Sequence, residues 1–280
     1  MAASEAKRWA VLIGIDFYEE PDDVKYADRR PTNLSGCVAD VTEVEQVLRT
    51  QYGVPPERIF KLTAPVPTHP RVWSFVGQML SSYWYGSKKE SGRMLMSRIP
   101  GSANKPSPTY QNIIDAFKNV IENAHADDFV YIHYSGHGRR VTSIFQNLKV
   151  DFTDQPDEAL VPTDIGTSKG RYLRDVELHY LLQKMVQKKL KVFIVLDCCH
   201  SGGATRMFQL KIRDLGELDR TVYESDVSLL PSDELTSTWP SSQGMKGYTC
   251  LAACGEHDPA YEKRYQNGKV HGALTYSFIY

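Results

Sequence analysis

The sequence has little of what membrane-bound, secreted or nucleic-acid-binding proteins require. Residues 1–7 contain no apolar signal core, and no apolar run approaches the roughly 20 residues that cross a bilayer. The 33 lysines and arginines nearly cancel the 34 aspartates and glutamates, which leaves no basic footprint for nucleic acid. We therefore expect an intracellular, cytoplasmic monomer that binds neither nucleic acid nor membrane.

Cysteines are also few, and their spacing argues against a disulfide framework. Five occur, at positions 37, 198, 199, 250 and 254, an odd number with no repeated interval. A zinc site built from Cys198, Cys199 and His200 is the competing idea. Adjacent side chains on an extended backbone point to opposite faces, however, and cannot easily share one ion. A reducing compartment fits the chain better.

Two apolar runs, residues 129–134 and 192–196, lack polar alternation and predict strands buried on both faces. His137, between two glycines, follows the first, and Cys198 and Cys199 follow the second. Because open α/β sheets bind ligands at the carboxyl ends of their strands, we expect thiol and imidazole at one edge. There the imidazole can take a thiol proton and later protonate a leaving amine. Alone, a buried cysteine or a structural histidine is the commoner case, but the glycine context of both favours catalysis.

Apolar periodicity along the rest of the chain alternates between strand and helix. Strands are expected at 9–16, 58–63 and 247–254, and helices at 35–52, 109–124 and 173–188. This order predicts an α/β fold with a doubly wound, mostly parallel central sheet and helices on both faces.

The composition divides the chain into regions. A short tail, 1–8, precedes a large region, 9–205, which carries an insert at about 64–108 that is rich in Pro, Ser, Gly and Lys. Residues 206–246 are polar and acidic, and we expect an exposed linker there. A small region, 247–280, follows.

The sequence around the His and Cys resembles a known family. Tyr134-Ser-Gly-His-Gly138 and Asp197-Cys-Cys-His-Ser-Gly202 are similar to the His and Cys boxes of the metacaspases, caspase-like cysteine peptidases of peptidase family C14, clan CD. Residues 34–41, and 251–254 with 272–275, resemble two further boxes in family order. The resemblance implies a caspase-like fold with a p20-type large region and a p10-type small region. Related enzymes continue for another helix and strand, so we expect a truncated small region.

The resemblance also implies the activity and the residues that perform it. The chain is expected to be a cysteine endopeptidase with Cys199 as nucleophile and His137 as its acid/base partner. The backbone N–H groups of Gly138 and Cys199 would form the oxyanion hole. The sequence reveals no third residue that orients the histidine.

The P1 pocket implied by the resemblance is lined by Asp40, Asp197, Cys37 and Ser135. A carboxylate pair in a partly dry pocket favours Arg or Lys, so the expected partners are protein or peptide substrates with a basic P1 residue. Without the surrounding box, Asp40 would be interpreted as a solvated helix residue.

The chemistry requires no cofactor, but the resemblance leaves calcium activation open. Asp157 and Asp175 match family ligands, whereas Val176 and Arg206 stand where further acids are expected. Calcium takes roughly 6 to 8 oxygen ligands, so these two replacements would weaken or move the site. Asp157 and Asp175 could equally be a cap and a turn residue.

Self-cleavage follows from the predicted specificity, because the linker carries basic residues. The candidate positions are Arg206, Lys211, Arg213, Arg220 and Lys246.

Three alternatives remain. The chain could be a catalytically inactive caspase-like interaction module, since a fold does not guarantee activity. It could be a separase-like peptidase with similar boxes. A dinucleotide-binding loop is the weakest, because Val141 replaces the third glycine of a fingerprint beginning at Gly136.

Overall fold

The computed structural model describes residues 5–67, 106–145, 156–198, 211–212, 218–231, 247–253 and 260–280. Most of the predicted insert lies outside these ranges, as do Cys199, Arg206, Arg213 and Lys246. No helix in the described ranges has the length and apolar character needed to cross a bilayer.

A five-stranded sheet forms the centre of the molecule, and all four of its strand pairings are parallel. Its order is β2 (Ile59–Ala64), β1 (Arg8–Ile15), β3 (Phe129–Ser135), β7 (Lys191–Asp197) and β9 (Tyr248–Ala252). The register pairs Gly14 with Ser135 and Ser135 with Asp197, so the middle strands end level with one another. The predicted parallel α/β sheet is confirmed.

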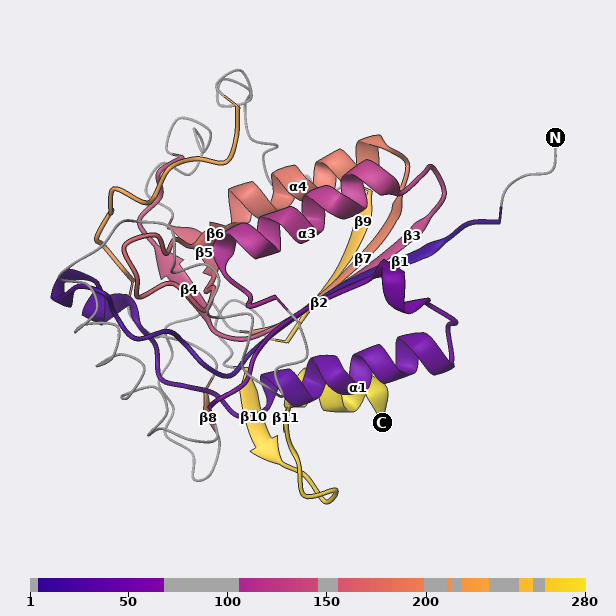
Figure 1. Ribbon diagram of the computed structural model, residues 1–280, viewed down its shortest axis with the longest axis horizontal. Coiled ribbons are helices and arrows are strands. Elements are labelled where there is room, and N and C mark those ends of the chain that lie inside the picture. Colours follow the sequence, from indigo (N-terminus) through magenta and orange to yellow (C-terminus); the bar gives the residue numbers. More distant parts are fainter. Residues whose placement is uncertain are drawn as a thin grey trace, which may run out of the picture.

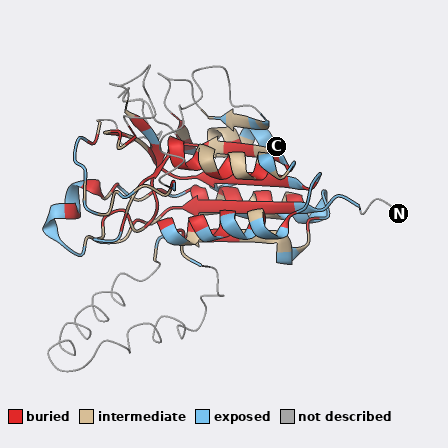
Figure 2. Cartoon of the chain, turned by 90° about the horizontal axis from the view of Figure 1, so that it is seen from above, coloured by how far each residue is buried: buried red, intermediate tan, exposed pale blue. Residues whose placement is uncertain are grey.

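Helices cover both faces of this sheet, as predicted (Figure 1). Helices α3 (Tyr110–Asn123) and α4 (Asp175–Gln187) lie on one face, and α1 (Cys37–Thr50) and α5 (Ala273–Ile279) on the other. Residues alternate along β1: Val11 packs towards α3, whereas Leu12 packs towards α1. Figure 2 shows the resulting buried layer between the two sets of helices.

Smaller elements gather at the carboxyl end of the sheet (Figure 1). One antiparallel sheet contains β4 (Gly138–Val141), β5 (Asp157–Leu160) and β6 (Leu173–Arg174). Another contains β8 (Lys211–Ile212), β10 (Tyr261–Arg264) and β11 (Val270–Gly272). Two short 3-10 helices, η1 (Val24–Arg29) and η2 (Pro56–Arg58), complete the described elements.

The described part of the predicted linker, 218–231, is less exposed than its composition indicates. Asp219 bonds through its backbone to Arg140 and Thr142 of the β4 segment. Asp219 and Leu230 are buried, although Arg220 is exposed. Polar residues of this segment form hydrogen bonds with residues of the large region. The pattern of residues within the segment cannot reveal partners that lie far away in the sequence.

Gly14 marks the closest approach of a helix to the sheet. A Cβ atom there would lie 2.6 Å from both the Cys37 carbonyl oxygen and Val41 Cγ2, at the first turn of α1. We expect Gly14→Ala to lower the free energy of unfolding by about 1–3 kcal/mol, because a packed backbone cannot easily yield. Urea denaturation measures the loss.

Gly166→Ala is the matched control, since its nearest contacts, Arg30 Cβ and the Glu19 carbonyl oxygen, both lie at 3.2 Å and need to move much less than the 2.6 Å contacts of Gly14. Equal losses in the two variants would contradict this account.

Candidate active site

His137 follows β3 and is 1% exposed. Its backbone N–H donates to the Tyr18 hydroxyl at 2.9 Å, and its Nε2 lies 2.9 Å from the Thr32 carbonyl oxygen. A carbonyl oxygen only accepts, so Nε2 carries a hydrogen. In the neutral ring Nδ1 therefore holds the lone pair, which suits it to accept a proton. Thr32 thus orients the histidine through its backbone, which explains why no third side chain is evident in the sequence.

Tyr134 stabilises the turn that presents His137. Its hydroxyl lies 2.6 Å from the His137 carbonyl oxygen and accepts a hydrogen bond from Val161 N at 3.1 Å. Burial raises the pKa of Tyr134 well above its ordinary value, so the hydroxyl remains a donor. A Cβ at Gly136 would lie 2.6 Å from that hydroxyl, which accounts for the first glycine of the box.

The N–H of Gly138 points away from the neighbouring strand β5. Val161 N donates to the His137 carbonyl oxygen at 3.2 Å, so this carbonyl faces β5 at the start of the antiparallel ladder. The next residue along such a strand turns its N–H to the opposite side. Gly138 therefore turns its donor to the side of β4 that faces away from β5, and its predicted part in an oxyanion hole stays a prediction.

The nucleophile predicted from the sequence, Cys199, lies outside the described residues. Cys198, its predecessor, is buried at the end of β7. Because Asp197 pairs with Ser135, the segments leading to Cys199 and His137 leave adjacent strands at the same level. The contact between the two side chains stays a prediction.

Asp40 is buried and accepts several hydrogen bonds, so it is not a solvated helix residue. Its carboxylate accepts hydrogen bonds from Ser135 Oγ at 2.7 Å, from His271 Nδ1 at 2.9 Å and from Gly272 N at 3.1 Å. The predicted pocket residues Asp40 and Ser135 are thus in direct contact. His271 was not predicted, although it immediately precedes the recognised box at 272–275.

Asp197 and Cys37, the other two predicted pocket residues, are also buried. Asp197 Oδ2 accepts hydrogen bonds from the Thr275 backbone N–H at 2.9 Å and from its hydroxyl at 2.5 Å. The backbone N–H of Cys37 donates to Asp16 at 2.8 Å. The corner between β11 and α5 therefore supplies donors to both acids, Asp40 and Asp197.

A buried chain of hydrogen bonds extends from Asp197 into the sheet. The Thr275 hydroxyl donates to Asp197, so it accepts from His133 Nε2 at 3.0 Å. His133 Nδ1 then accepts from the Tyr131 hydroxyl at 3.0 Å, and burial raises the pKa of Tyr131. Every donor in this chain is directed towards Asp197. Sequence patterning places His133 inside a strand and gives no hint of this role.

The two predicted calcium ligands have other partners in the structure. Asp157 Oδ2 accepts a hydrogen bond from Arg174 Nη1 at 2.9 Å, and both side chains are buried. Asp175 Oδ1 accepts from the Val176 backbone N–H at the start of α4. A guanidinium beside Asp157 does not fit an ion that requires roughly 6 to 8 oxygens.

In the described part of the chain, one other cluster has the spacing of a metal site: Asp16, Cys37 and Glu262. Both carboxylates accept from backbone N–H groups around the start of α1, Asp16 from Cys37 and Glu262 from Gly36 at 3.1 Å. Acids at a helix N-terminus are stabilising without an ion.

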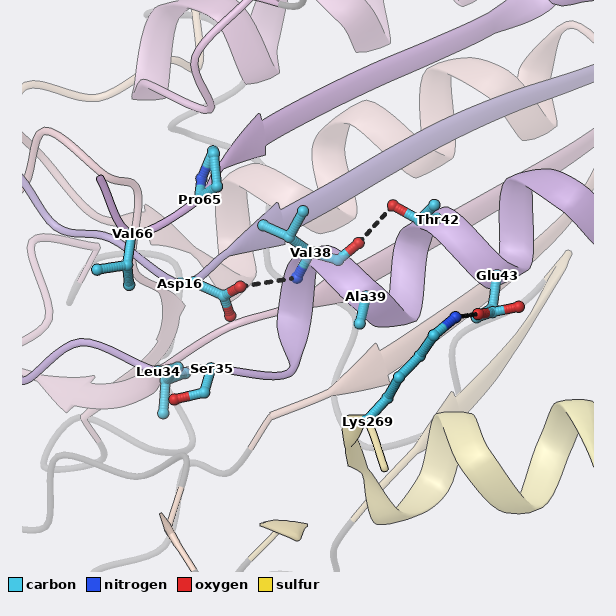
Figure 3. Close-up of a pocket in the computed structure, with 10 residues that line it drawn as sticks. All are labelled: Asp16, Leu34, Ser35, Val38, Ala39, Thr42, Glu43, Pro65, Val66 and Lys269. Atoms are coloured by element: carbon cyan, nitrogen blue, oxygen red, sulfur yellow. Dashed lines mark hydrogen bonds and ion pairs between the residues drawn. The ribbon is translucent and has the colours of Figure 1, made fainter. Parts of the chain in front are cut away.

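A cavity of about 570 Å³ lies beside this cluster (Figure 3). It is lined by Asp16, Leu34, Ser35, Val38, Ala39, Thr42, Glu43, Pro65, Val66 and Lys269. Its polar groups bond within the protein: Thr42 to the Val38 carbonyl oxygen, and Lys269 to Glu43. We assign no ligand to it.

Comparison with known proteins agrees with the boxes. Residues 75–207 match the family model described as the metacaspase, peptidase C14 domain. Metacaspase-1 of Schizosaccharomyces pombe is 26% identical over 200 residues, covering 71% of this chain and 35% of the yeast protein. Metacaspase-3 of Arabidopsis thaliana is 24% identical over 274 residues, covering 98% of this chain and 59% of the plant protein. The match thus spans about a third to three fifths of these relatives.

A solved structure of a Geobacter sulfurreducens protein has the same fold, with a TM-score of 0.58 and 17% sequence identity. The match covers 98% of this chain and 80% of the bacterial chain. Together with the family model over residues 75–207 and the curated relatives at 24–26% identity, the parallel sheet and its boxes show what the chain is similar to: the metacaspases, peptidase family C14.

Proposed function

We propose that this chain is a cysteine endopeptidase that cleaves after Arg or Lys, with Cys199 as nucleophile and His137 as acid/base. The observation that carries the proposal is the Nε2 bond of His137 to the Thr32 carbonyl, which leaves Nδ1 as the basic nitrogen at the edge where β3 and β7 end. An activated thiol needs such a base within reach.

The proposed reaction has two stages. His137 Nδ1 takes the thiol proton as Cys199 Sγ attacks the scissile carbonyl carbon. The N–H groups of Gly138 and Cys199 donate to the oxyanion, and the imidazolium then protonates the leaving amine. Water, deprotonated by His137, hydrolyses the thioester and restores the thiol.

The proposed specificity comes from Asp40 and Asp197. Both carboxylates are buried at the carboxyl end of the sheet: Asp40 accepts a hydrogen bond from Ser135, and Ser135 pairs with Asp197, two residues before the nucleophile. A cationic P1 side chain that enters this environment gains much more from a carboxylate than it would at the surface. An acidic P1 side chain would be repelled.

Self-cleavage extends the same proposal. Among the described candidates, Lys211 lies in β8 and pairs with β10, whereas Arg220 is exposed. A protease needs an extended, accessible segment, so Arg220 suits cleavage better than Lys211. Arg206, Arg213 and Lys246 lie outside the described residues and remain candidates.

A panel of fluorogenic peptides that differ only at P1 tests the function. We expect cleavage with Arg and Lys and none with Asp, and no cleavage of any peptide by Cys199→Ala. Mass spectrometry of the same preparations should show fragments ending at basic residues in the parent chain only. Cleavage after Asp, or fragments that persist in Cys199→Ala, would contradict the assignment.

A further inference from the structure

Four buried charged side chains meet beside the small sheet formed by β4, β5 and β6. Arg29 is 1% exposed, Arg174 2% and Asp157 0%, and the Asp226 side chain is 1% exposed. Arg29 ends η1, Asp157 begins β5, Arg174 ends β6, and Asp226 lies in the segment 218–231. We call these four residues the quartet and residues 218–231 the strap.

The quartet is linked by direct contacts. Arg174 Nη1 donates to Asp157 Oδ2 at 2.9 Å and to the Thr142 carbonyl oxygen at 2.8 Å. Its Nη2 lies 3.7 Å from Asp226 Oδ2. Arg29 Nη2 donates to Asp226 Oδ1 at 3.1 Å. Asp226 is therefore held between two guanidinium groups.

Other contacts hold the strap along its length. Ser225 Oγ and Arg29 Nη1 both donate to the Gly170 carbonyl oxygen, at 2.8 and 3.1 Å. Near one end, Leu229 N donates to Glu177 Oε1 at 2.9 Å. Near the other, Asp219 bonds to the backbone of residues 140 and 142.

The strap lies against the edge of β4 that carries the proposed oxyanion donor. Backbone groups alternate along a strand, so Arg140 O and Thr142 N face the same side as Gly138 N–H. Arg140 O and Thr142 N both bond to Asp219, at 3.0 and 2.8 Å. The strap therefore supports this edge within a few residues of the site.

The charges of the quartet sum to zero, two guanidinium groups against two carboxylates. A calcium ion placed at Asp157 would leave an excess of two positive charges in a buried environment or would expel Arg174, and either result is costly. The residues present therefore do not fit a calcium ion at Asp157.

We propose that Arg174, with Arg29, supplies the positive charge that fastens the strap, so that this chain neither binds calcium at Asp157 nor needs it. The claim about binding stands without the proposed peptidase function, and only its consequence for activity rests on that function.

Calcium titration tests whether the chain binds calcium at Asp157. The full chain with Cys199→Ala is used, so that neither self-cleavage nor loss of activity affects the result. Up to about 5 mM calcium chloride, well above the weakest protein sites at roughly 10⁻⁴–10⁻³ M, we expect no heat of binding in calorimetry and no change in Tm. A calcium-dependent rise in Tm that Asp157→Asn abolishes would overturn it.

Substitution of Arg174 tests whether this arginine fastens the strap. Arg174→Gln leaves two buried carboxylates with one guanidinium, and we expect Tm to fall by roughly 6–20 °C. Chymotrypsin should then cut the strap after Tyr223, whose ring packs against Tyr26 and the Arg29 guanidinium in the parent chain. Arg49→Gln is the control, since Arg49 is half exposed and pairs with Glu45 within one helix. If Arg174→Gln fails to fold, Asp226→Asn removes only the acid that the strap contributes to the quartet, and we expect it to expose Tyr223 to chymotrypsin. If the strap of these variants resists the protease as well as the strap of the parent chain does, the quartet does not fasten it.

Discussion

Replacing His137 with Ala is expected to reduce kcat/KM for a peptide with Arg at P1 by roughly 10³–10⁴-fold. The loss should appear in kcat, because in the proposed mechanism the imidazole acts on the thiol and the leaving amine and takes no part in substrate binding. Thiol labelling at Cys199 should also slow at neutral pH, since the thiolate loses its stabilising partner. Steady-state kinetics and the rate of alkylation measure the two effects.

The control separates chemistry from stability. His125→Ala changes an exposed histidine whose backbone N–H donates to Asp128, a bond that the substitution keeps, so its kinetics should match those of the parent chain. His137→Gln keeps more of the buried volume and should be as inactive as His137→Ala. A kcat within tenfold of the parent value in a folded His137 variant would rule out this histidine as the acid/base.

The second large effect is expected for Asp40→Asn. The substitution keeps the shape of the side chain but removes a buried charge that interacts with Ser135 and His271. We expect kcat/KM for a P1 Arg peptide to fall by roughly 10²–10³-fold, mainly through KM, because a desolvated charge pair is lost in both the bound and the transition states.

A neutral P1 residue provides the internal comparison. We expect cleavage after Leu to be slow in the parent chain and nearly unchanged in Asp40→Asn, so that the preference for Arg over Leu collapses. Glu43→Gln alters another carboxylate of α1, which pairs with Lys269, and should leave the preference intact. Equal losses for both peptides would show that Asp40 acts on folding or chemistry and not on P1 recognition.

Several elements of the fold follow from short-range patterns. The run at 129–134 and the run at 192–196 became β3 and β7, because uninterrupted apolar residues require burial on both faces. The helix predicted at 109–124 is α3, and Thr109 caps it by accepting a hydrogen bond from Asn112 N at 3.2 Å. These features depend on neighbours a few residues apart.

The partners of the site residues could not be predicted in this way. Thr32 acts through a backbone carbonyl, a group that every residue possesses. His271 and Thr275 reach Asp40 and Asp197 across sequence separations of 231 and 78 residues. Asp226 lies in a segment whose polar composition suggested exposure, and its side chain is nonetheless buried between two arginines.

Local patterning was therefore enough for the five strands of the central sheet, for helices α1, α3 and α4 and for the two boxes, since apolar periodicity and glycine-flanked turns depend on consecutive residues. Tertiary packing decided the rest. Because β11 and α5 pack against α1, their residues donate hydrogen bonds to Asp40 and Asp197. Because the strap packs against β4, Asp226 joins the quartet in which Arg174 balances the charge of Asp157. Those pairings form only when distant segments pack together. The free-energy cost of burying a charged side chain depends on which group pairs with it, and that partner can lie anywhere in the sequence.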